Sequence, residues 1–216
     1  MAFLQGRMGS RRLPGKTLMK IHGRSILERA ISRLQASPVV DAVVVLTTLL
    51  KEDDAIVAEC GRLGVPFYRG SEDDVLERFF EAAEIFRPEI VIRATADNPL
   101  IEIGSIKRIV AMLRSDDLDY CMEKDLPYGA ATEAMTAAAL AKTHAAARDP
   151  VHREHVTIYI KERPDEFRVL LPDPPASLRR PDFRVTVDTP EDFAAMERLI
   201  GRFPETGSPR PLENYF

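Results

Sequence analysis

The sequence lacks tryptophan, contains only two cysteines and has no long apolar run. Cys60 and Cys121 lie far apart in the chain and do not make a disulfide framework, so we expect two reduced thiols in a cytoplasmic protein. No apolar stretch approaches the roughly 18 residues that span a bilayer, and the first residues are too short in apolar length for a signal peptide. We therefore expect a soluble chain without a membrane partner.

An overall excess of positive charge is also absent. The chain carries a formal net charge of −4, whereas nucleic-acid-binding proteins are normally basic, so we expect no nucleic-acid partner. Residues 1–35 nevertheless hold eight basic residues and one acidic residue, which predicts a local anion site at this end. Arg24, Arg29 and Arg33 fit the solvated face of a helix. The cations of residues 7–16 do not, because they lie in a loop that contains glycine and proline.

The composition that is present is that of a globular α/β protein. The 216 residues are 45% hydrophobic and 30% charged, and we expect one domain over residues 1–216. Short apolar segments predict strands at 2–5, 42–47, 65–68, 90–94, 118–122, 167–171 and 184–187. Amphipathic spacing predicts helices at 24–35, 52–63, 72–86, 103–114, from about 137, at 149–163 and at 191–200. This alternation favours a three-layer, Rossmann-like α/β fold around a mostly parallel sheet, with the tail from Pro204 along the surface.

A basic loop follows the first expected strand. It reads Gln-Gly-Arg-Met-Gly-Ser-Arg-Arg-Leu-Pro-Gly-Lys over residues 5–16. Ligands of open α/β sheets bind at the carboxyl ends of strands, where the backbone N–H groups and cations of such a loop can bind a phosphate chain. A Walker loop is excluded because five residues separate Gly9 from Gly15-Lys16-Thr17, and the Gly-x-Gly-x-x-Gly dinucleotide pattern is absent.

Two aspartates follow expected strands. Asp97 comes after the apolar strand at 90–94, and Asp188 comes after the strand at 184–187. Two carboxylates at strand ends, facing a phosphate loop, suit Mg²⁺ held between the protein and a triphosphate. The alternative for Asp188 is a helix cap, because Thr189-Pro190 begins a helix. His152 and His155 are three residues apart, but without a third ligand we do not expect a zinc site.

Five motifs, in the same order, resemble those of the cytidylyltransferase family, which includes the CMP-sialate and CMP-KDO synthetases. The spore-coat polysaccharide biosynthesis protein F group is the most similar branch. The motifs are Arg-Met-Gly-Ser-x-Arg-Leu-Pro-Gly-Lys at 7–16, Arg-Gly-Ser-Glu-Asp-Asp-Val-Leu at 69–76, Arg-Ala-Thr-Ala-Asp-Asn-Pro-Leu-Ile at 93–101, Asp-Pro with Arg-Glu-His-Val-Thr at 149–157, and Val-Thr-Val-Asp-Thr-Pro-Glu-Asp at 185–192. Gly6, Arg11 and Asn98 depart from the pattern, since relatives often have alanine, a small hydroxyl residue and cysteine there.

The resemblance implies a nucleotidyltransferase fold and transfer of CMP from CTP to a sugar or acidic sugar for surface polysaccharide, with release of pyrophosphate. It also implies a homodimer, with about 125–165 as an excursion for the acceptor or the dimer contact. Catalytic contacts to the triphosphate are expected from Arg7 and Lys16. Nucleotide contacts are expected from Gly9, Ser10, Arg11, Arg12, Arg69 and Thr95. Acceptor contacts are expected from Tyr128, Gly129, Glu133, Glu154 and His155. Asp97 and Asp188 would hold Mg²⁺.

Two other functions remain open from the residues. A glycosyltransferase that uses a nucleotide-sugar donor would share the broad fold, but such enzymes carry Asp-x-Asp after a strand, and here Asp97 is followed by Asn98-Pro99. A nucleotide- or sugar-binding module without turnover is the other. The presence of Lys16, Asp97 and Asp188 together argues against it.

Overall fold

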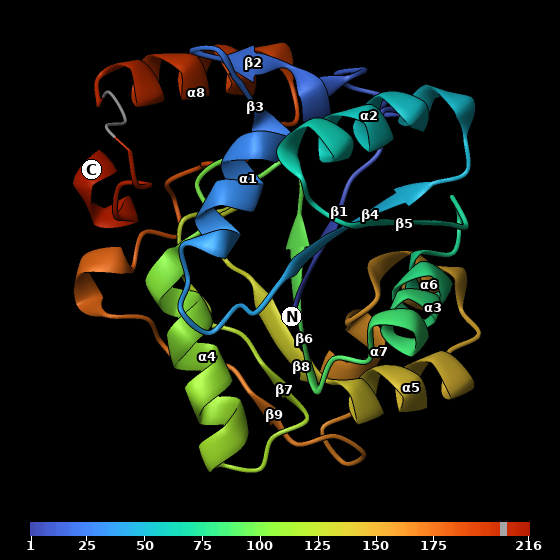
Figure 1. Ribbon diagram of the computed structural model, residues 1–216. Coiled ribbons are helices and arrows are strands. Elements are labelled where there is room, and N and C mark those ends of the chain that lie inside the picture. Colours follow the sequence, from blue (N-terminus) through green and yellow to red (C-terminus); the bar gives the residue numbers. More distant parts are fainter. Residues whose placement is uncertain (204–206) are drawn as a thin grey trace.

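The computed structural model describes residues 1–203 and 207–216. Its centre is a seven-stranded sheet with the order β5-β4-β1-β6-β8-β7-β9 (Figure 1). The strands are β1 (Ala2–Gln5), β4 (Val43–Thr48), β5 (Phe67–Gly70), β6 (Ile90–Thr95), β7 (Tyr120–Cys121), β8 (Glu133–Thr136) and β9 (Val169–Leu170). β8 runs antiparallel to both of its neighbours, and the other pairs are parallel. The mostly parallel mixed sheet predicted from the sequence is therefore confirmed.

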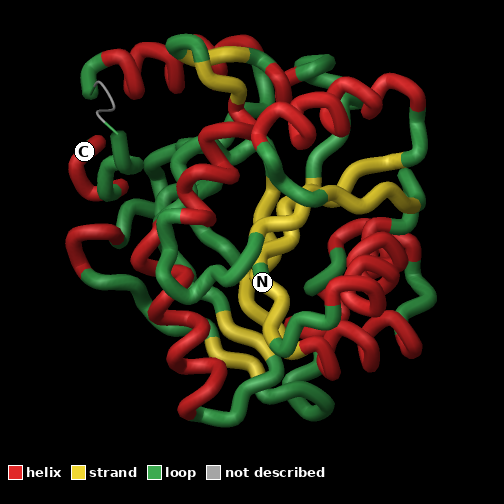
Figure 2. Tube along the Cα trace, viewed as in Figure 1, coloured by secondary structure: helices red, strands yellow, loops and turns green. Residues whose placement is uncertain are grey.

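Helices cover both faces of this sheet and make the outer two layers (Figure 2). The α-helices of the described residues are α1 (Ile26–Gln35), α2 (Asp54–Leu63), α3 (Val75–Phe86), α4 (Ile103–Ser115), α5 (Ala137–Ala146), α6 (Pro150–His155), α7 (Ile158–Lys161) and α8 (Pro190–Gly201). Helix α8 does not cover the central sheet and packs in a third apolar cluster. Helices α1, α2 and α4 contribute to the core on one face, and α3, α5 and α7 to the core on the other. Among the described residues, no helix is long and apolar enough to cross a membrane.

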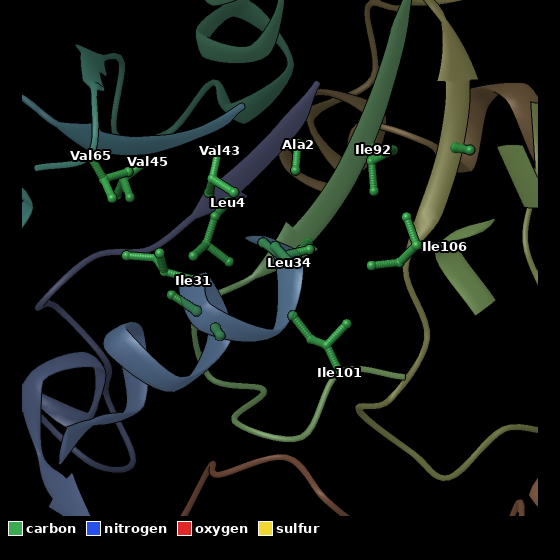
Figure 3. Packing of buried hydrophobic residues seen from close by; sticks show 14 of the residues in the cluster. Ala2, Leu4, Ile31, Leu34, Val43, Val45, Val65, Ile92, Ile101 and Ile106 are labelled. Atoms are coloured by element: carbon green, nitrogen blue, oxygen red, sulfur yellow. The ribbon is translucent and has the colours of Figure 1, made fainter. Parts of the chain in front are cut away.

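The apolar strands explain why the sheet is covered twice. In β1, Ala2 and Leu4 pack into one core while Phe3 packs into the other, because successive side chains of a strand point to opposite faces. Figure 3 shows the first core, where Leu4 lies near Ile31 and Leu34 of α1. All three are fully or almost fully buried. A strand that is apolar on both faces needs two helical layers, and this is the arrangement found.

The strand order places the carboxyl ends of β1 and β6 at a switch point. From β1 the chain moves outward to β4 and β5, and then returns to the other side of β1 as β6. Crevices that bind ligands in open α/β sheets lie where the strand order reverses in this way. The loop after Gln5 and the turn after Thr95 both leave the sheet at this point, since Gln5 and Thr95 are paired in register.

The prediction that Arg24, Arg29 and Arg33 form a solvated helix face is wrong for two of the three. Arg29 and Arg33 are 4% and 1% exposed. Arg29 donates a hydrogen bond to the carbonyl of Ile21, and Arg33 donates to that of Ile101. Only Arg24 is partly exposed, in an ion pair with Glu28 at 2.9 Å. The two buried guanidinium groups donate to backbone carbonyls of the connecting segments, contacts that a helical periodicity does not reveal.

Several segments differ from the predicted elements. The inner strand β8 was not expected, and it lies within the segment 125–165 and pairs with β6 and β7. The segment 184–187 is extended but outside the sheet, where the amides of Val185 and Val187 donate to the carbonyls of Tyr128 and Asp97. The helix expected from residue 24 begins at Ile26, because residues 20–25 form the hairpin of β2 (Lys20–Ile21) and β3 (Arg24–Ser25).

The helix expected at 149–163 is divided into α6 and α7 by Val156. This residue has φ 53° and ψ −53°, and the amide of Thr157 donates to the carbonyl of His155 across it. Positive φ is unfavourable for a β-branched side chain, so the turn is a strained γ-turn, held here by the complete burial of Val156. At the C-terminus, Leu212 and Tyr215 are buried, while Pro204, where the surface tail was expected to begin, lies outside the described residues.

Candidate active site

Three charged side chains from distant parts of the chain meet at the switch point. The ammonium nitrogen of Lys16 lies 2.9 Å from Oδ2 of Asp97 and 2.9 Å from Oδ1 of Asp188. Its third hydrogen bond, also 2.9 Å, goes to the carbonyl of Val187. Lys16 is largely buried, and the protein supplies an acceptor for each of the three N–H groups of its ammonium. The structure thus brings together the loop cation and the two strand-end carboxylates that the sequence singled out.

Glycines give the loop its path to this point. A Cβ on Gly6 would lie 2.8 Å from Cβ of Ala96, so only glycine lets the end of β1 pass the turn after β6. Gly15 has φ 73°, in the left-handed region that glycine adopts without strain, and the 3-10 helix Lys16–Leu18 follows directly. Thr17 donates a hydrogen bond to the carbonyl of Arg7, which closes the loop on itself.

Asp188 lies among cations and is not the cap of α8. Arg12 and Arg184 lie 3.0 and 2.6 Å from its carboxylate, in addition to Lys16. Burial alone would raise the pKa of Asp188, but hydrogen bonds and charges from these cations outweigh it and lower the pKa. The capping residue is Thr189, whose hydroxyl accepts from the amide of Asp192. Asp188 therefore stays ionised, with its carboxylate shared among these three cations.

The loop lines a cleft of about 720 Å³ at the carboxyl ends of β1 and β6. Of the expected site residues, those in its wall are Arg7, Gly9, Ser10, Arg11, Arg12, Lys16, Thr95, Asp97, Glu154, His155 and Asp188. The opposite wall comes from the start of α3, and Arg7 ties the loop to it through Glu72 at 3.2 Å. The cleft is therefore lined by the cations of the loop and by the acidic residues before α3.

A second cavity of about 660 Å³ adjoins the cleft. It includes three of the residues expected to contact an acceptor, namely Tyr128, Gly129 and Glu133. The side chain of Tyr128 is 60% exposed, and the guanidinium of Arg184 lies 4.9 Å from the centre of its ring. Five residues line both spaces, and they are Arg12, Arg93, Thr95, Asp97 and Asp188. Two ligands bound side by side would therefore meet at this common wall.

Three expected site residues lie elsewhere than predicted. Arg69 is not part of either cavity wall, because its guanidinium donates to the carbonyls of Thr48 and Leu50 and pairs with Asp54. It fixes the loop after β4 instead. Glu154 and His155 line the cleft with the basic loop and not the second cavity.

Two arginines in the cavity walls were missed by the sequence analysis. Arg93 interrupts the apolar strand β6, and that interruption was the signal that could have identified it. Arg78 of α3 is 3% exposed and lines the cleft, and its Nε has no hydrogen-bond partner among the described residues. Burial, and then the nearby charge of Arg7, lower the pKa of Arg78 to about 10. A buried guanidinium that lacks a carboxylate partner is costly and fits a cleft that receives an anionic ligand.

The donor set at the common wall fits a cation that prefers oxygen. Asp97 and Asp188 already converge on one positive group, the ammonium of Lys16. Magnesium is usually held by one or two carboxylates together with oxygens of the substrate. Within residues 1–203 and 207–216, no group of three or more His, Cys, Asp or Glu side chains is arranged to hold a metal ion.

A glycine-containing cationic loop that meets two carboxylates at the switch point of a mostly parallel sheet fits a nucleotide-binding α/β enzyme of the nucleotidyltransferase class. Comparison with known proteins gives the family. The cytidylyltransferase family model matches residues 1–213. The chain therefore belongs to the cytidylyltransferase family, as its motifs predicted, and members of this family generally use a divalent metal.

Individual relatives agree with this assignment over most of the chain. The chain is 42% identical to the uncharacterized protein MJ1063 of Methanocaldococcus jannaschii, over 93% of this chain and 82% of that one. It is 32% identical to the spore coat polysaccharide biosynthesis protein SpsF of Bacillus subtilis, over 91% and 84%. A solved cytidylyltransferase from Leptospira borgpetersenii superposes with a TM-score of 0.89 at 29% identity, covering 94% of this chain and 87% of the other.

Proposed function

We propose that this protein transfers CMP from CTP to a hydroxyl group of a sugar or acidic sugar and releases pyrophosphate, for the synthesis of a surface polysaccharide. The observation that carries the proposal is the meeting of Lys16, Asp97 and Asp188 at the wall shared by the two cavities. The similarity to a spore coat polysaccharide protein supports the destination of the product.

The two cavities divide the substrates between them. The loop cations, with Lys16, would bind the phosphates that leave, while the second cavity beside Tyr128 and Gly129 would hold the acceptor. An oxygen of the acceptor forms a bond to the α-phosphorus as the bond from that phosphorus to the bridging oxygen breaks. The electron pair leaves with pyrophosphate, and the proton of the acceptor hydroxyl passes to solvent. The chain contributes alignment of the two partners and charges arranged in advance for the transfer.

The metal in this proposal is Mg²⁺, held by Asp97 and Asp188. When bound, it would neutralise negative charge on the polyphosphate. The depressed pKa of Asp188 keeps one of its two ligands ionised at neutral pH. Lys16 lies between the same carboxylates, so it would exchange at least one of them for a phosphate oxygen when the nucleotide binds.

The test is pyrophosphate release from each of the four nucleoside triphosphates, with Mg²⁺ and a panel of neutral and acidic sugars. Release that requires CTP together with one class of acceptor is the expected result. Binding of nucleotide without turnover for any acceptor would point to a binding module. Transfer of a sugar from a nucleotide-sugar donor, with no reaction of CTP, would point to a glycosyltransferase.

The setting of the enzyme follows the same proposal. Both cysteines are free and buried, which suits a reducing compartment such as the cytoplasm. The segment 125–165 exposes Tyr128 and Val151, at 60% and 51%, and would provide the contact of a homodimer. Light scattering on a size-exclusion column measures the mass directly, and Val151→Glu should shift a dimer toward a monomer if this segment forms the contact.

A further inference from the structure

Glu133, expected to contact the acceptor, has its carboxylate bound by four donors of the protein. Its Oε1 accepts hydrogen bonds from Tyr120 at 2.6 Å, Thr157 at 2.7 Å and Lys161 at 3.2 Å. Its Oε2 pairs with Arg93. A carboxylate offers about four acceptor positions, and with three donors on Oε1 and one on Oε2 the protein takes most of them. Glu133 is 7% exposed, and such a buried charge is retained only where several partners compensate it.

The network around Glu133 holds the side chain of Arg93. It lies directly across from Glu133 in the antiparallel pair of β6 and β8, and its Nε donates to the side chain of Gln5 at 3.1 Å. These contacts with Glu133 and Gln5 fix the guanidinium of Arg93. The side chain of Arg93 is 16% exposed. Its Nη2 has no hydrogen-bond partner in the described part of the chain, although Arg93 lines both cavities.

Arg93 differs from the other arginine of the common wall. The side chain of Arg12 is 64% exposed and pairs with Asp188, so its position is weakly determined. A cation lowers a reaction barrier most when it is held in place before the charge develops, because no energy is then spent on orienting it. Arg93 alone among the five shared residues is a cation fixed by a buried partner.

We propose that Arg93 is a catalytic residue that contacts the α-phosphoryl group during transfer, and that Glu133 is the positioning residue that orients it. The inference rests on the proposed function, since the common wall is where the α-phosphorus and the acceptor oxygen would meet. As the new oxygen–phosphorus bond forms and the bond to pyrophosphate breaks, Nη2 donates to a non-bridging oxygen of the transferred group. Arg93 donates a hydrogen bond and transfers no proton, and the proton of the acceptor hydroxyl goes to solvent.

The first experiment measures kcat and the affinity for CTP in Arg93→Met and Arg93→Lys. Arg93→Met should lower kcat by about 10²- to 10³-fold, the usual cost of losing one donor that stabilises the transition state. Its calorimetric Kd for CTP should change by less than about tenfold, because the contact strengthens in the transition state. Arg93→Lys keeps the positive charge but loses the planar guanidinium. Its kcat should lie between the kcat of the wild type and that of Arg93→Met. A kcat of Arg93→Met close to that of the wild type would overturn the assignment.

The second experiment tests whether Glu133 acts through Arg93. Glu133→Gln should lower kcat with little change in KM, and the double variant with Arg93→Met should be no slower than Arg93→Met alone. If the two reductions in kcat multiplied in the double variant, Glu133 would act independently of Arg93. That result would overturn its positioning role. The test still works if Arg93→Met fails to fold. Arg93→Lys and Glu133→Gln are conservative substitutions, and each should also lower kcat.

The matched control is Arg108→Lys. Arg108 also pairs with a buried glutamate, Glu123, at 2.6 Å. Glu123 lines the second cavity, as Glu133 does, but Arg108 itself lines neither cavity, so the two pairs differ in where the arginine lies. Arg108→Lys should lose stability comparable to Arg93→Lys while keeping kcat. Equal losses of kcat in both variants would mean that a broken buried ion pair, and not the position of Arg93, explains the effect. A wild-type protein that releases no pyrophosphate would overturn the proposed function, whereas an active wild type with an active Arg93→Met would overturn this inference alone.

Discussion

Lys16 and Asp97 are 81 residues apart in the chain, yet their ammonium nitrogen and carboxylate oxygen are 2.9 Å apart. Asp188, 172 residues from Lys16, completes the group at the same distance. The contact joins the loop after β1, the turn after β6 and the segment before α8. Each of these side chains therefore has a testable role that can be separated from the stability of the fold.

Asp97→Asn should reduce turnover by about 100-fold or more, because it removes a negative charge from the expected metal site. The fold should persist, since Lys16 keeps Asp188 and the carbonyl of Val187 as partners, and the loss of stability should stay within about 1 kcal/mol. Pyrophosphate release and thermal unfolding measure the two effects. Asp165→Asn, at an exposed position, is the control. Near-normal activity of Asp97→Asn would refute the metal assignment.

Lys16→Met should weaken the binding of CTP by about tenfold or more, because a charge-assisted hydrogen bond to phosphate is lost. Isothermal titration measures this affinity directly. Lys20→Met offers a comparison, since Lys20 is an exposed cation of the hairpin that follows. An unchanged affinity for CTP in Lys16→Met would reject its role at the phosphates.

The same substitution should have the opposite effect on metal binding without nucleotide. The ammonium of Lys16 occupies the space between both carboxylates, so it competes with any cation that they could share. In Lys16→Met, a titration of Mn²⁺ followed by electron paramagnetic resonance should show tighter binding than in the wild type. Equal Mn²⁺ affinity in the two proteins would indicate that the carboxylates do not bind a cation jointly.

The network around Glu133 should make stability depend on pH in acid. Burial raises the pKa of Glu133, but the charges of Arg93 and Lys161 and two hydrogen bonds outweigh it and lower the pKa from 4.5 to about 2. Between these values the unfolded chain binds a proton that the folded chain does not, so stability falls as the pH falls, by about 1.4 kcal/mol per unit of the shift. Chemical denaturation between pH 2.5 and 7 should show a steeper acid loss in the wild type than in Glu133→Gln. Parallel curves would contradict the depressed pKa.

Gly6→Ala should destabilise the protein by about 1–3 kcal/mol, because the new Cβ would lie 2.8 Å from Cβ of Ala96. Ala96→Gly removes that neighbour, so the double variant should regain most of the loss. Denaturant unfolding of the wild type, both single variants and the double variant makes a complete cycle. An additive result would show that these two positions are not in contact.

Elements with long apolar runs or clear helical spacing were predictable from the sequence. β1 and α3 lie within about three residues of the predicted bounds. Their apolar residues follow the spacing of a strand and a helix within the segment itself, so no distant part of the chain is needed to recognise them. β8 was not predictable, since its four residues Glu-Ala-Met-Thr follow no strand periodicity and are held by pairing with β6. Arg29 and Arg33 were misassigned because their partners are carbonyls brought near only by the folded chain.

The site was predictable to the extent that its residues adjoin strand ends or occur in motifs. Lys16, Asp97 and Asp188 were identified by these signals, and the structure brings them together. The pairing of Glu133 with Arg93 was not visible, because the two residues are 40 positions apart and meet only through sheet register. Arg69 was misplaced since its motif gave no information on the carbonyls that it binds.

The extended segment 184–187 has a consequence for biosynthesis on the ribosome. It delivers Asp188 to Lys16 through two backbone hydrogen bonds, from Val185 to Tyr128 and from Val187 to Asp97, and it does so outside the central sheet. A nascent chain can thus pair all seven strands while the ammonium of Lys16 still lacks one of its carboxylates. Catalytic competence would be acquired only after the segment 184–187 emerges and joins a preformed scaffold.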